Sequence, residues 1–357
     1  MSIFRKNKPA AVTNQAEPFD ETRYGMVHYR DVAVDEALGD AALAGAAQAA
    51  RCGDWKPAAE ALAATGTDTD TDTDTDWDRR MLRVAVLSTV SLQTSAWLDS
   101  WRSAEPESPH AAVVHAASLM GQAGRARGTA RAKATSREQF EGFFKLARES
   151  DEAALRAIEL SPEDPTPWVF RMSAALGRQI PNDEFTVLWN EAFARAPMHR
   201  RAHSYAHTYW LAKWFGSEEW SAQFVEDAVA RAPRTALAFE LKIHRLQEAW
   251  LTVRDASPDP GTAADFCRGA GRPLLDEALG QWDGKVPTGG ALEIVDRNLL
   301  AWALTMAERY DEACDVFQAV GASVCMGYPW LYYRDARVAF GSVRREAIEN
   351  SSRRPTH

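Results

Sequence analysis

Apolar residues recur at intervals of three and four along most of the chain, the spacing that places them on one face of an α-helix. The clearest case is the segment 235–251, in which Phe239, Ile243, Leu246 and Trp250 follow one another at steps of four, three and four residues. Runs of the same kind cover 35–50, 57–64, 79–101, 110–123, 135–160, 165–176, 183–196, 199–214, 218–232, 263–279, 292–308, 311–320 and 330–350. No run alternates in the manner of a β-sheet, so the sequence predicts an all-α protein.

A short phrase that begins with alanine closes three of these runs, at 157–162, 192–197 and 228–233, and each time it ends at a proline. The three prolines lie 35 and 36 residues apart. Because proline cannot continue a helix, this period indicates a repeated pair of helices. We therefore predict a right-handed α-solenoid over residues 23–345 that forms one body with a continuous hydrophobic core.

Three segments lack this pattern. Residues 1–22 are polar and contain two prolines, which predicts a disordered N-terminal tail. Residues 67–76 consist of five Thr-Asp dipeptides without a hydrophobic residue, which predicts a low-complexity loop within the solenoid. Residues 346–357 are expected to form a flexible C-terminal tail.

The helix pairs resemble degenerate tetratricopeptide repeats. Trp168 lies six residues after Pro162, where that family has the tryptophan of its first helix, and Gly53 and Trp55 match the glycine and aromatic positions of its turn. Arg171 stands at a position that is apolar in the family and departs from the pattern. The resemblance implies a concave surface, made by the first helices of successive repeats, that binds a peptide or protein segment.

A second resemblance is to the bacterial family called domain of unknown function 4034. Pro-Thr-Pro-Trp at 165–168 and Lys-Trp-Phe-Gly-Ser at 213–217 carry it. This resemblance implies no known activity. Within the second motif we expect Gly216 to end a helix in the left-handed conformation and Ser217 to cap the next helix.

The net charge of −9 argues against general attraction to nucleic acid or to an anionic membrane. The four cysteines, at positions 52, 267, 314 and 325, lack the spacing of a metal site and are expected to be reduced thiols. No signal-peptide pattern or membrane-length apolar stretch is present, so we expect a cytoplasmic protein. The 33 arginines against 8 lysines indicate a bacterial, GC-rich genome.

The candidate binding residues are Trp168, His203, His207, Trp210 and Trp214. His203 and His207 stand four apart on one predicted helix, and a shift of one residue in the repeat register decides whether they pack between helices or face the inner surface. In the second case they would form a ligand-facing patch with the neighbouring aromatic residues.

Two other readings stay open. The histidine pair has a spacing that suits a metal, and an enzyme or metal-dependent protein would use it, but no glutamate or other carboxylate lies near in sequence. The basic segment 125–137 would suit nucleic acid, although no aromatic residue is interleaved for base stacking. Nucleophile, phosphate-loop and dinucleotide motifs are absent. We therefore predict a non-catalytic interaction scaffold with a protein or peptide partner, no cofactor, no metal and no membrane association.

Overall fold

The computed structural model describes residues 19–65, 73–128, 135–257, 260–282, 291–325, 329–330, 333 and 335–356. Over these ranges the protein is all-α, as predicted, with sixteen α-helices and one pair of two-residue strands. The first nine helices are α1 (Ala41–Arg51), α2 (Lys56–Ala63), α3 (Thr73–Ser91), α4 (Ala96–Ala104), α5 (Pro109–Arg127), α6 (Arg137–Leu160), α7 (Thr166–Arg178), α8 (Asn182–Arg195) and α9 (Arg200–Tyr209). The others are α10 (Glu218–Arg231), α11 (Ala236–Ala256), α12 (Pro260–Arg268), α13 (Arg272–Gly280), α14 (Ala291–Met306), α15 (Tyr310–Val320) and α16 (Ala336–Asn350).

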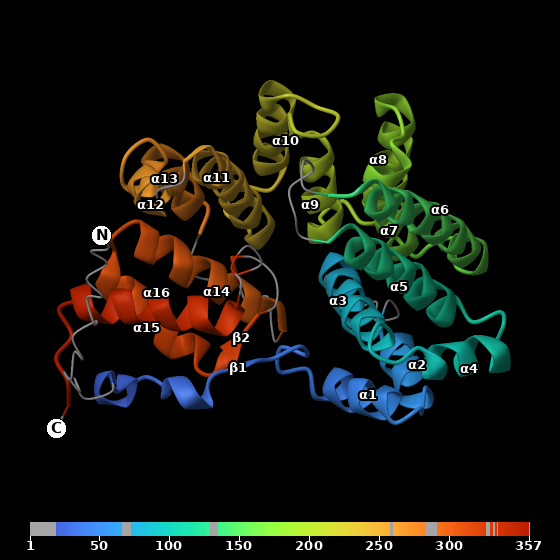
Figure 1. Ribbon diagram of the computed structural model, residues 1–357, viewed down its shortest axis with the longest axis horizontal. Helices are drawn as coiled ribbons and strands as arrows, with labels where there is room; N and C mark the ends of the chain where they lie inside the picture. The colour runs from blue at the N-terminus through green and yellow to red at the C-terminus, as the bar shows by residue number, and fades with distance from the viewer. Residues whose placement is uncertain are drawn as a thin grey trace, which may run out of the picture.

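The helices from α3 to α11 follow an arc with two layers (Figure 1). Helices α3, α5, α7, α9 and α11 contact one another in that order along the inner side. Helices α4, α6, α8 and α10 lie outside them, each against its sequence neighbour in the inner layer. The solenoid arrangement, its right-handed sense and the tetratricopeptide character of the pairs stay predictions.

The three proline phrases end helices where the sequence predicts. Helices α6, α8 and α10 stop at Leu160, Arg195 and Arg231, two residues before the proline in each case. In each, the backbone N–H of the next residue donates to the carbonyl four residues earlier and closes the last turn. The phrases therefore mark the outer helix of each pair.

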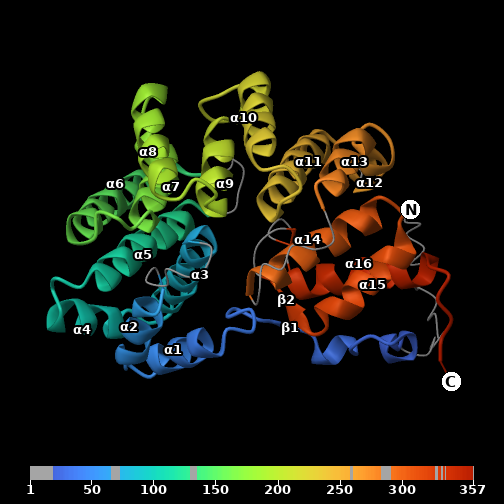
Figure 2. The same cartoon turned by 180° about the vertical axis from the view of Figure 1, so that it is seen from behind.

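Residues 19–40, which we call the N-terminal strap, cross the C-terminal helices α14–α16 before the chain enters α1 (Figures 1 and 2). The strap contains two short 3₁₀-helices, η1 (Glu21–Tyr24) and η2 (Tyr29–Asp31), and strand β1 (Ala33–Val34). Strand β1 pairs in parallel with β2 (Ser323–Val324). The strap and the C-terminal region thus lie side by side, and the arc is closed into a ring.

The predicted disordered tail ends earlier than expected. Its residues 1–18 lie outside the described ranges, but residues 19–22 are ordered, and the Glu21 carboxylate is buried 3.3 Å from the fully buried guanidinium of Arg344 on α16. A buried arginine needs an opposite charge, which holds this part of the chain in place. A polar composition alone did not reveal that partner.

The predicted C-terminal tail is also partly structured. Helix α16 continues through Asn350, and beyond it Arg353 pairs with Asp315 of α15. The backbone N–H of Thr356 donates to the carbonyl of Arg23 in the strap. Contacts with both the strap and α15 therefore order residues that have little hydrophobic character.

The predicted Thr-Asp loop overlaps the start of helix α3. Residues 66–72 lie outside the described part of the chain, whereas α3 begins at Thr73, inside the predicted loop. Threonine and aspartate are favourable residues at helix N-termini, so this composition suits the start of α3 as well as a loop.

The hydrophobic core of the described residues is divided into three clusters, which corrects the expectation of a single continuous core. The first cluster joins α1 to α9, the second joins the strap to α11 and α13–α16, and a small third one lies between α10 and α11. Leu82 of α3 packs against both large clusters. The molecule therefore has an N-terminal half, α1–α9, and a C-terminal half, α11–α16 with the strap.

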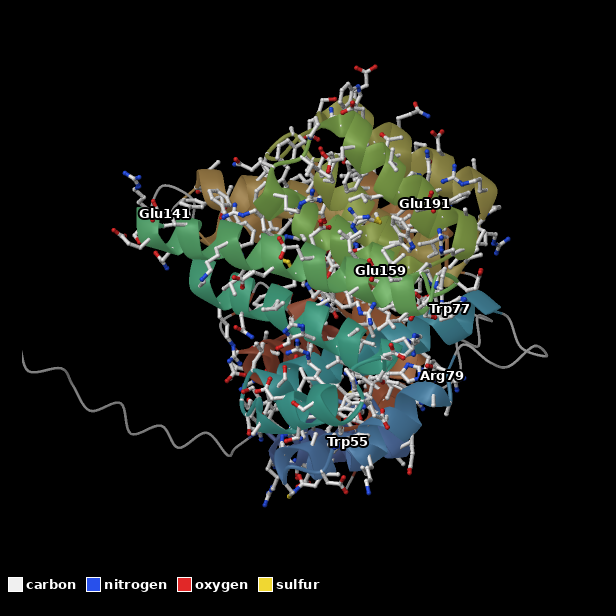
Figure 3. All side chains as sticks on the ribbon, turned by 90° about the vertical axis from the view of Figure 1, so that its right-hand side faces the viewer. Trp55, Trp77, Arg79, Glu141, Glu159 and Glu191 are labelled. Carbon is white, nitrogen blue, oxygen red and sulfur yellow. The ribbon has the colours of Figure 1, made fainter. Side chains whose placement is uncertain are left out.

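The outer face of the N-terminal half is polar. Figure 3 shows it with many charged side chains, including Glu159 of α6 and Glu191 of α8. These two carboxylates pair within their own helices, with Arg156 at 3.0 Å and Arg195 at 2.6 Å. Within the described ranges, no helix combines the length and hydropathy that crossing a bilayer requires.

Candidate functional site

A cavity of about 330 Å³ lies where the two halves meet, lined by residues of the strap, α3, α9, α11 and α14. A smaller space of about 80 Å³ adjoins it. The two spaces share the lining residues Leu82, Ala85, Arg201, Glu240 and Val295, so we treat them together as the central cavity. Its walls come from both halves and from both ends of the sequence.

The start of α9 is positioned by a residue of α3. After α8 ends, the chain turns at Pro197, and the backbone N–H of Arg200 donates to the Asp78 carboxylate at 3.0 Å. The buried His199 places its Nδ1 3.0 Å from the same carboxylate. A carboxylate is favourable at a helix N-terminus, where backbone N–H groups have no partner within the helix. Asp78 therefore fixes the position of the basic pair Arg200–Arg201 in the seam, the region where the N-terminal and C-terminal halves meet.

Arg200 joins three helices. Its buried guanidinium donates from Nε to Glu240 of α11 at 2.6 Å and from Nη2 to Asp296 of α14 at 2.5 Å. With Asp78 at its backbone, one guanidinium is surrounded by three carboxylates. Charged hydrogen bonds of this kind are among the strongest in proteins, so Arg200 connects α9 of the N-terminal half to α11 and α14 of the C-terminal half.

The two carboxylates bound to Arg200 differ in proton affinity. Burial raises the pKa of Asp296 to about 6, and although Arg200 opposes this, Glu240 and Asp78 add to it by repulsion. Burial also acts to raise the pKa of Glu240, but Arg200, His244 and Arg201 outweigh it and lower that pKa to about 2. Glu240 is therefore ionised at neutral pH, while Asp296 is the carboxylate that takes up a proton first.

Arg201 is the neighbouring residue on α9, but its surroundings are different. It is exposed at the rim of the central cavity and forms no ion pair with a residue of the described ranges. Its guanidinium carbon lies 5.9 Å from the centre of the Tyr205 ring. A free guanidinium beside a cavity offers up to five N–H donors to an anionic group of a ligand.

The wall beside Arg201 is aliphatic. Leu82 and Val86 lie one turn apart on α3, and Val295 and Leu299 lie one turn apart on α14. Residues at this spacing share one face of a helix, so each helix presents an aliphatic stripe to the cavity. The central cavity therefore suits an apolar group that carries a carboxylate beside it.

The strap forms the remaining wall through a tight turn at residues 35–39. The Asp35 carboxylate accepts the backbone N–H groups of Ala37, Leu38 and Gly39 at 2.9 to 3.0 Å. Leu38 has a φ of 50° and Gly39 a φ of 77°, both in the left-handed region. This conformation is costly for leucine, and the hydrogen bonds to Asp35 together with the burial of Leu38 in the second core cluster hold it.

His203 occupies a packing position between helices. Its side chain is buried, Nδ1 lies 3.0 Å from the carbonyl of His199, and the rings of Trp189, Phe193 and Phe224 surround it. Burial lowers its pKa to about 4, so the ring is neutral at neutral pH. His203 is therefore part of the aromatic packing between α8, α9 and α10.

The four other predicted binding residues lie in separate environments. The guanidinium carbons of Arg171 and Arg195 lie 5.3 and 4.9 Å from the centre of the Trp168 ring. Trp210 packs edge-on against Phe185 and Trp220. Trp214 is half-buried in the turn after α9, and His207 is buried and lines a different cavity. The structure therefore does not bring these residues and His203 into one patch, and a ligand-binding role for them stays a prediction.

The turn after α9 follows its motif in one respect and departs from it in another. Ser217 caps α10, since its hydroxyl accepts the N–H of Trp220 at 3.1 Å, as predicted. Gly216 is absent from the residues with positive φ, so the expected left-handed ending is wrong. A Cβ at Gly216 would lie 1.9 Å from the carbonyl oxygen of Trp210, and this close approach of two backbone segments is what requires glycine there.

Two alternatives from the sequence analysis were a metal site and a basic nucleic-acid site, and the described part of the chain bears on both. No group of three His, Cys, Asp or Glu side chains is arranged there to hold a metal. In the basic segment, Arg125 donates to the carbonyl of Leu92 at 2.6 Å and Arg137 pairs with Glu141 at 2.7 Å. Residues 129–134, including two of its basic side chains, lie outside the described ranges.

Sequence reasoning missed the residues of the central cavity. Glu240 and Asp296 interrupt apolar helix faces, directly between Phe239 and Leu241 and directly after Val295. A buried acid on an apolar face requires a buried base, and Arg200 was available close to a proline turn. The acidic residues on apolar helix faces were visible in the sequence, but the sequence does not show which of the many charged residues pair with them.

The fold and cavity define an all-α protein with an amphipathic cavity at the seam between two halves. Residues 58–213 match the family model described as domain of unknown function (DUF4034), which confirms the second resemblance. The matched segment extends from α2 to the turn after α9. Neither the curated proteins nor the solved structures compared with the chain gave a significant match.

Proposed function

We propose that the protein is a non-catalytic interaction protein that binds a peptide or protein segment in the central cavity. The bound segment carries an aspartate, a glutamate or a chain-terminal carboxylate next to an aliphatic side chain. The observation that carries this proposal is the exposed guanidinium of Arg201, which has no ion-pair partner within the described ranges and lies beside the aliphatic residues Leu82 and Val295.

The charges of the cavity favour an acidic group over a basic one. The carboxylates in the wall already have partners: Glu240 accepts from Arg200, Glu36 pairs with Arg51, and Asp35 accepts three backbone N–H groups. Arg201 has no such partner among the described residues. A carboxylate from outside therefore gains a charged hydrogen bond without breaking one.

The size of the cavity fits a side chain or two and not a folded domain. A space of about 330 Å³ is at the lower end of small-ligand sites, and the aliphatic stripes exclude water from an apolar anchor. The free thiols of Cys52, Cys267 and Cys314 support a reducing compartment, so we propose a location in the bacterial cytoplasm.

The experiment is a phage-displayed octapeptide library selected on the full-length protein and counter-selected on Arg201→Ala. We expect enrichment of peptides with Asp or Glu adjacent to Leu, Ile or Val, with binding to Arg201→Ala weaker by about tenfold or more, the effect of losing one charged hydrogen bond. Arg156→Ala is the matched control, because Arg156 is an exposed arginine on the outer face. Equal binding to wild type and Arg201→Ala, or enrichment of basic peptides, would contradict the proposal.

A further inference from the structure

A second cavity, of about 360 Å³, lies between α9, α10, α11, α12 and α13. We call it the His207 cavity. It shares no lining residue with the central cavity, so it is a separate site. Its volume falls within the range of small-molecule sites.

The side chain of His207 lines this cavity. The residue is 2% exposed, and its Nε2 is buried without a hydrogen-bond partner among the described residues. Burial, with the nearby charges of Arg245 and Lys213 and the neighbouring His244, lowers the pKa of His207 to about 3. The neutral imidazole offers one hydrogen bond at Nε2, and a buried nitrogen without that bond is unfavourable.

The charged residues of the lining include both signs. Lys213 and Arg245 are basic, Glu218 and Glu248 are acidic, and the four formal charges sum to zero. Lys213 and Glu248 form an ion pair 2.5 Å long, with side-chain exposures of 51% and 16%. A ligand with charge of a single sign would be attracted by one of these two side chains and repelled by the other. A small zwitterion presents opposite charges to both.

The remainder of the lining is mostly apolar, with Ser221 and Thr252 as its polar residues. It includes Leu211 after α9, Val253 of α11, Phe266 of α12 and Leu274 of α13. These side chains suit an aliphatic or aromatic group of a few carbon atoms.

We propose that the His207 cavity binds a free α-amino acid with an apolar side chain. Its carboxylate pairs with Lys213, its ammonium group pairs with Glu248, and its side chain packs against Phe266 and Leu274. His207 supplies the additional hydrogen bond at the buried end of the cavity. This site is independent of peptide binding at Arg201.

The test is isothermal titration calorimetry of the full-length protein with L-leucine and L-phenylalanine. Two analogues isolate the charges: isocaproate lacks the ammonium group of leucine, and isoamylamine lacks its carboxylate. We expect saturable binding of at least one of the two amino acids with a stoichiometry of one. For leucine, each analogue binds about tenfold more weakly or worse, because one ion pair with the partly buried Lys213–Glu248 pair is lost.

Three variants sharpen the result. Lys213→Met weakens amino-acid binding by about tenfold, whereas Lys145→Met, at an exposed ion-paired lysine of α6, leaves it unchanged. Arg201→Ala also leaves it unchanged, which separates this proposal from the one for the central cavity. Circular dichroism confirms that each variant is folded.

Two outcomes would overturn the proposal. One is the absence of saturable binding for both amino acids up to millimolar concentration. The other is binding in which isocaproate and isoamylamine match leucine, or in which Lys213→Met matches wild type, since the zwitterion would then not be recognised.

Discussion

The N-terminal and C-terminal halves are both helical, but they are completed in different ways. In the N-terminal half, each helix from α3 to α9 finds its packing partners within the next few helices of the sequence. In the C-terminal half, α14 and α16 pack with Met26, Val32 and Leu38 of the strap, which come from the opposite end of the chain. Because its contacts are local, the packing of the first half can be predicted from its sequence. The packing of the second half depends on a segment about 300 residues away.

The seam between the halves differs from both cores. Each half contains a buried ion pair of its own, Arg80–Asp164 and Glu21–Arg344, whereas the seam contains a network in which Arg200, Glu240 and Asp296 place three buried charged groups on three helices. Buried charges of this kind contribute little to the free energy of unfolding, but they require a specific arrangement of their partners. We infer that the seam sets how the two halves meet and thereby shapes the central cavity.

The largest expected effects come from removing one large ring from each core. Phe185 stacks on Tyr209 in the first cluster, and Phe340 packs edge-on against Phe317 in the second; both are fully buried. Phe185→Ala and Phe340→Ala should each lower the free energy of unfolding by about 3–5 kcal/mol. Urea denaturation gives the magnitude. Hydrogen exchange should show loosening of α7–α9 in the first variant and of α14–α16 in the second. Equal loosening of both halves by either variant would contradict the division.

The next effect concerns the strap. Glu21→Gln leaves the buried Arg344 without an opposite charge and should lower the free energy of unfolding by about 3–5 kcal/mol. The double variant Glu21→Gln with Arg344→Met removes both charges and should recover most of the loss. Denaturant titration of the three proteins measures both changes. A single variant as stable as wild type would show that the strap does not complete the C-terminal half.

The seam should respond to pH. Asp296 has a folded-state pKa of about 6, above its ordinary value of 3.8, so the folded protein binds this proton more tightly than the unfolded chain does. Its contribution to stability is then fully present below about pH 4 and is lost as the pH rises through about 6, by up to about 3 kcal/mol. Asp296→Asn should abolish this part of the pH dependence. Urea denaturation of both proteins between pH 4 and 7 tests it, and parallel curves would contradict the assignment.

The smallest effects are expected from substitutions at one helix end in each half. Gln179 after α7 and Glu308 after α14 are exposed residues with φ of 54° and 59°. Glycine adopts this conformation without strain, so Gln179→Gly and Glu308→Gly should each raise the free energy of unfolding by about 0.5–1 kcal/mol. Thermal denaturation at fixed pH measures the gain. A loss in one variant alone would show that its side chain has a contact role that the other lacks.

The sequence predicted the helices and their ends better than their long-range partners. The proline phrases at the ends of α6, α8 and α10 and the cap at Ser217 depend on neighbours within four residues, and the structure confirms them. The order of residues 19–22 depends on Arg344, and no local pattern contains that information. Local chemistry is visible in sequence, whereas pairing across the ring is not.

The candidate site shows the same limit. His203 and the three tryptophans stood out because their residue types and spacing are unusual, and yet the structure uses His203 for packing. Arg201 did not stand out, because one arginine among 33 carries no signal until its neighbours are known. What distinguishes it is the absence of an ion pair within the described ranges, which is a property of the fold.

The most direct test of the central cavity is methyl NMR of the full-length protein, labelled at leucine and valine, during titration with the peptide selected on it. We expect the methyl resonances of Leu82, Val86, Val295 and Leu299 to shift together and to saturate, while those of the exposed Val187 on α8 stay in place. Shifts confined to other helices, or no shift at any of the four cavity residues with a peptide that binds, would contradict the account.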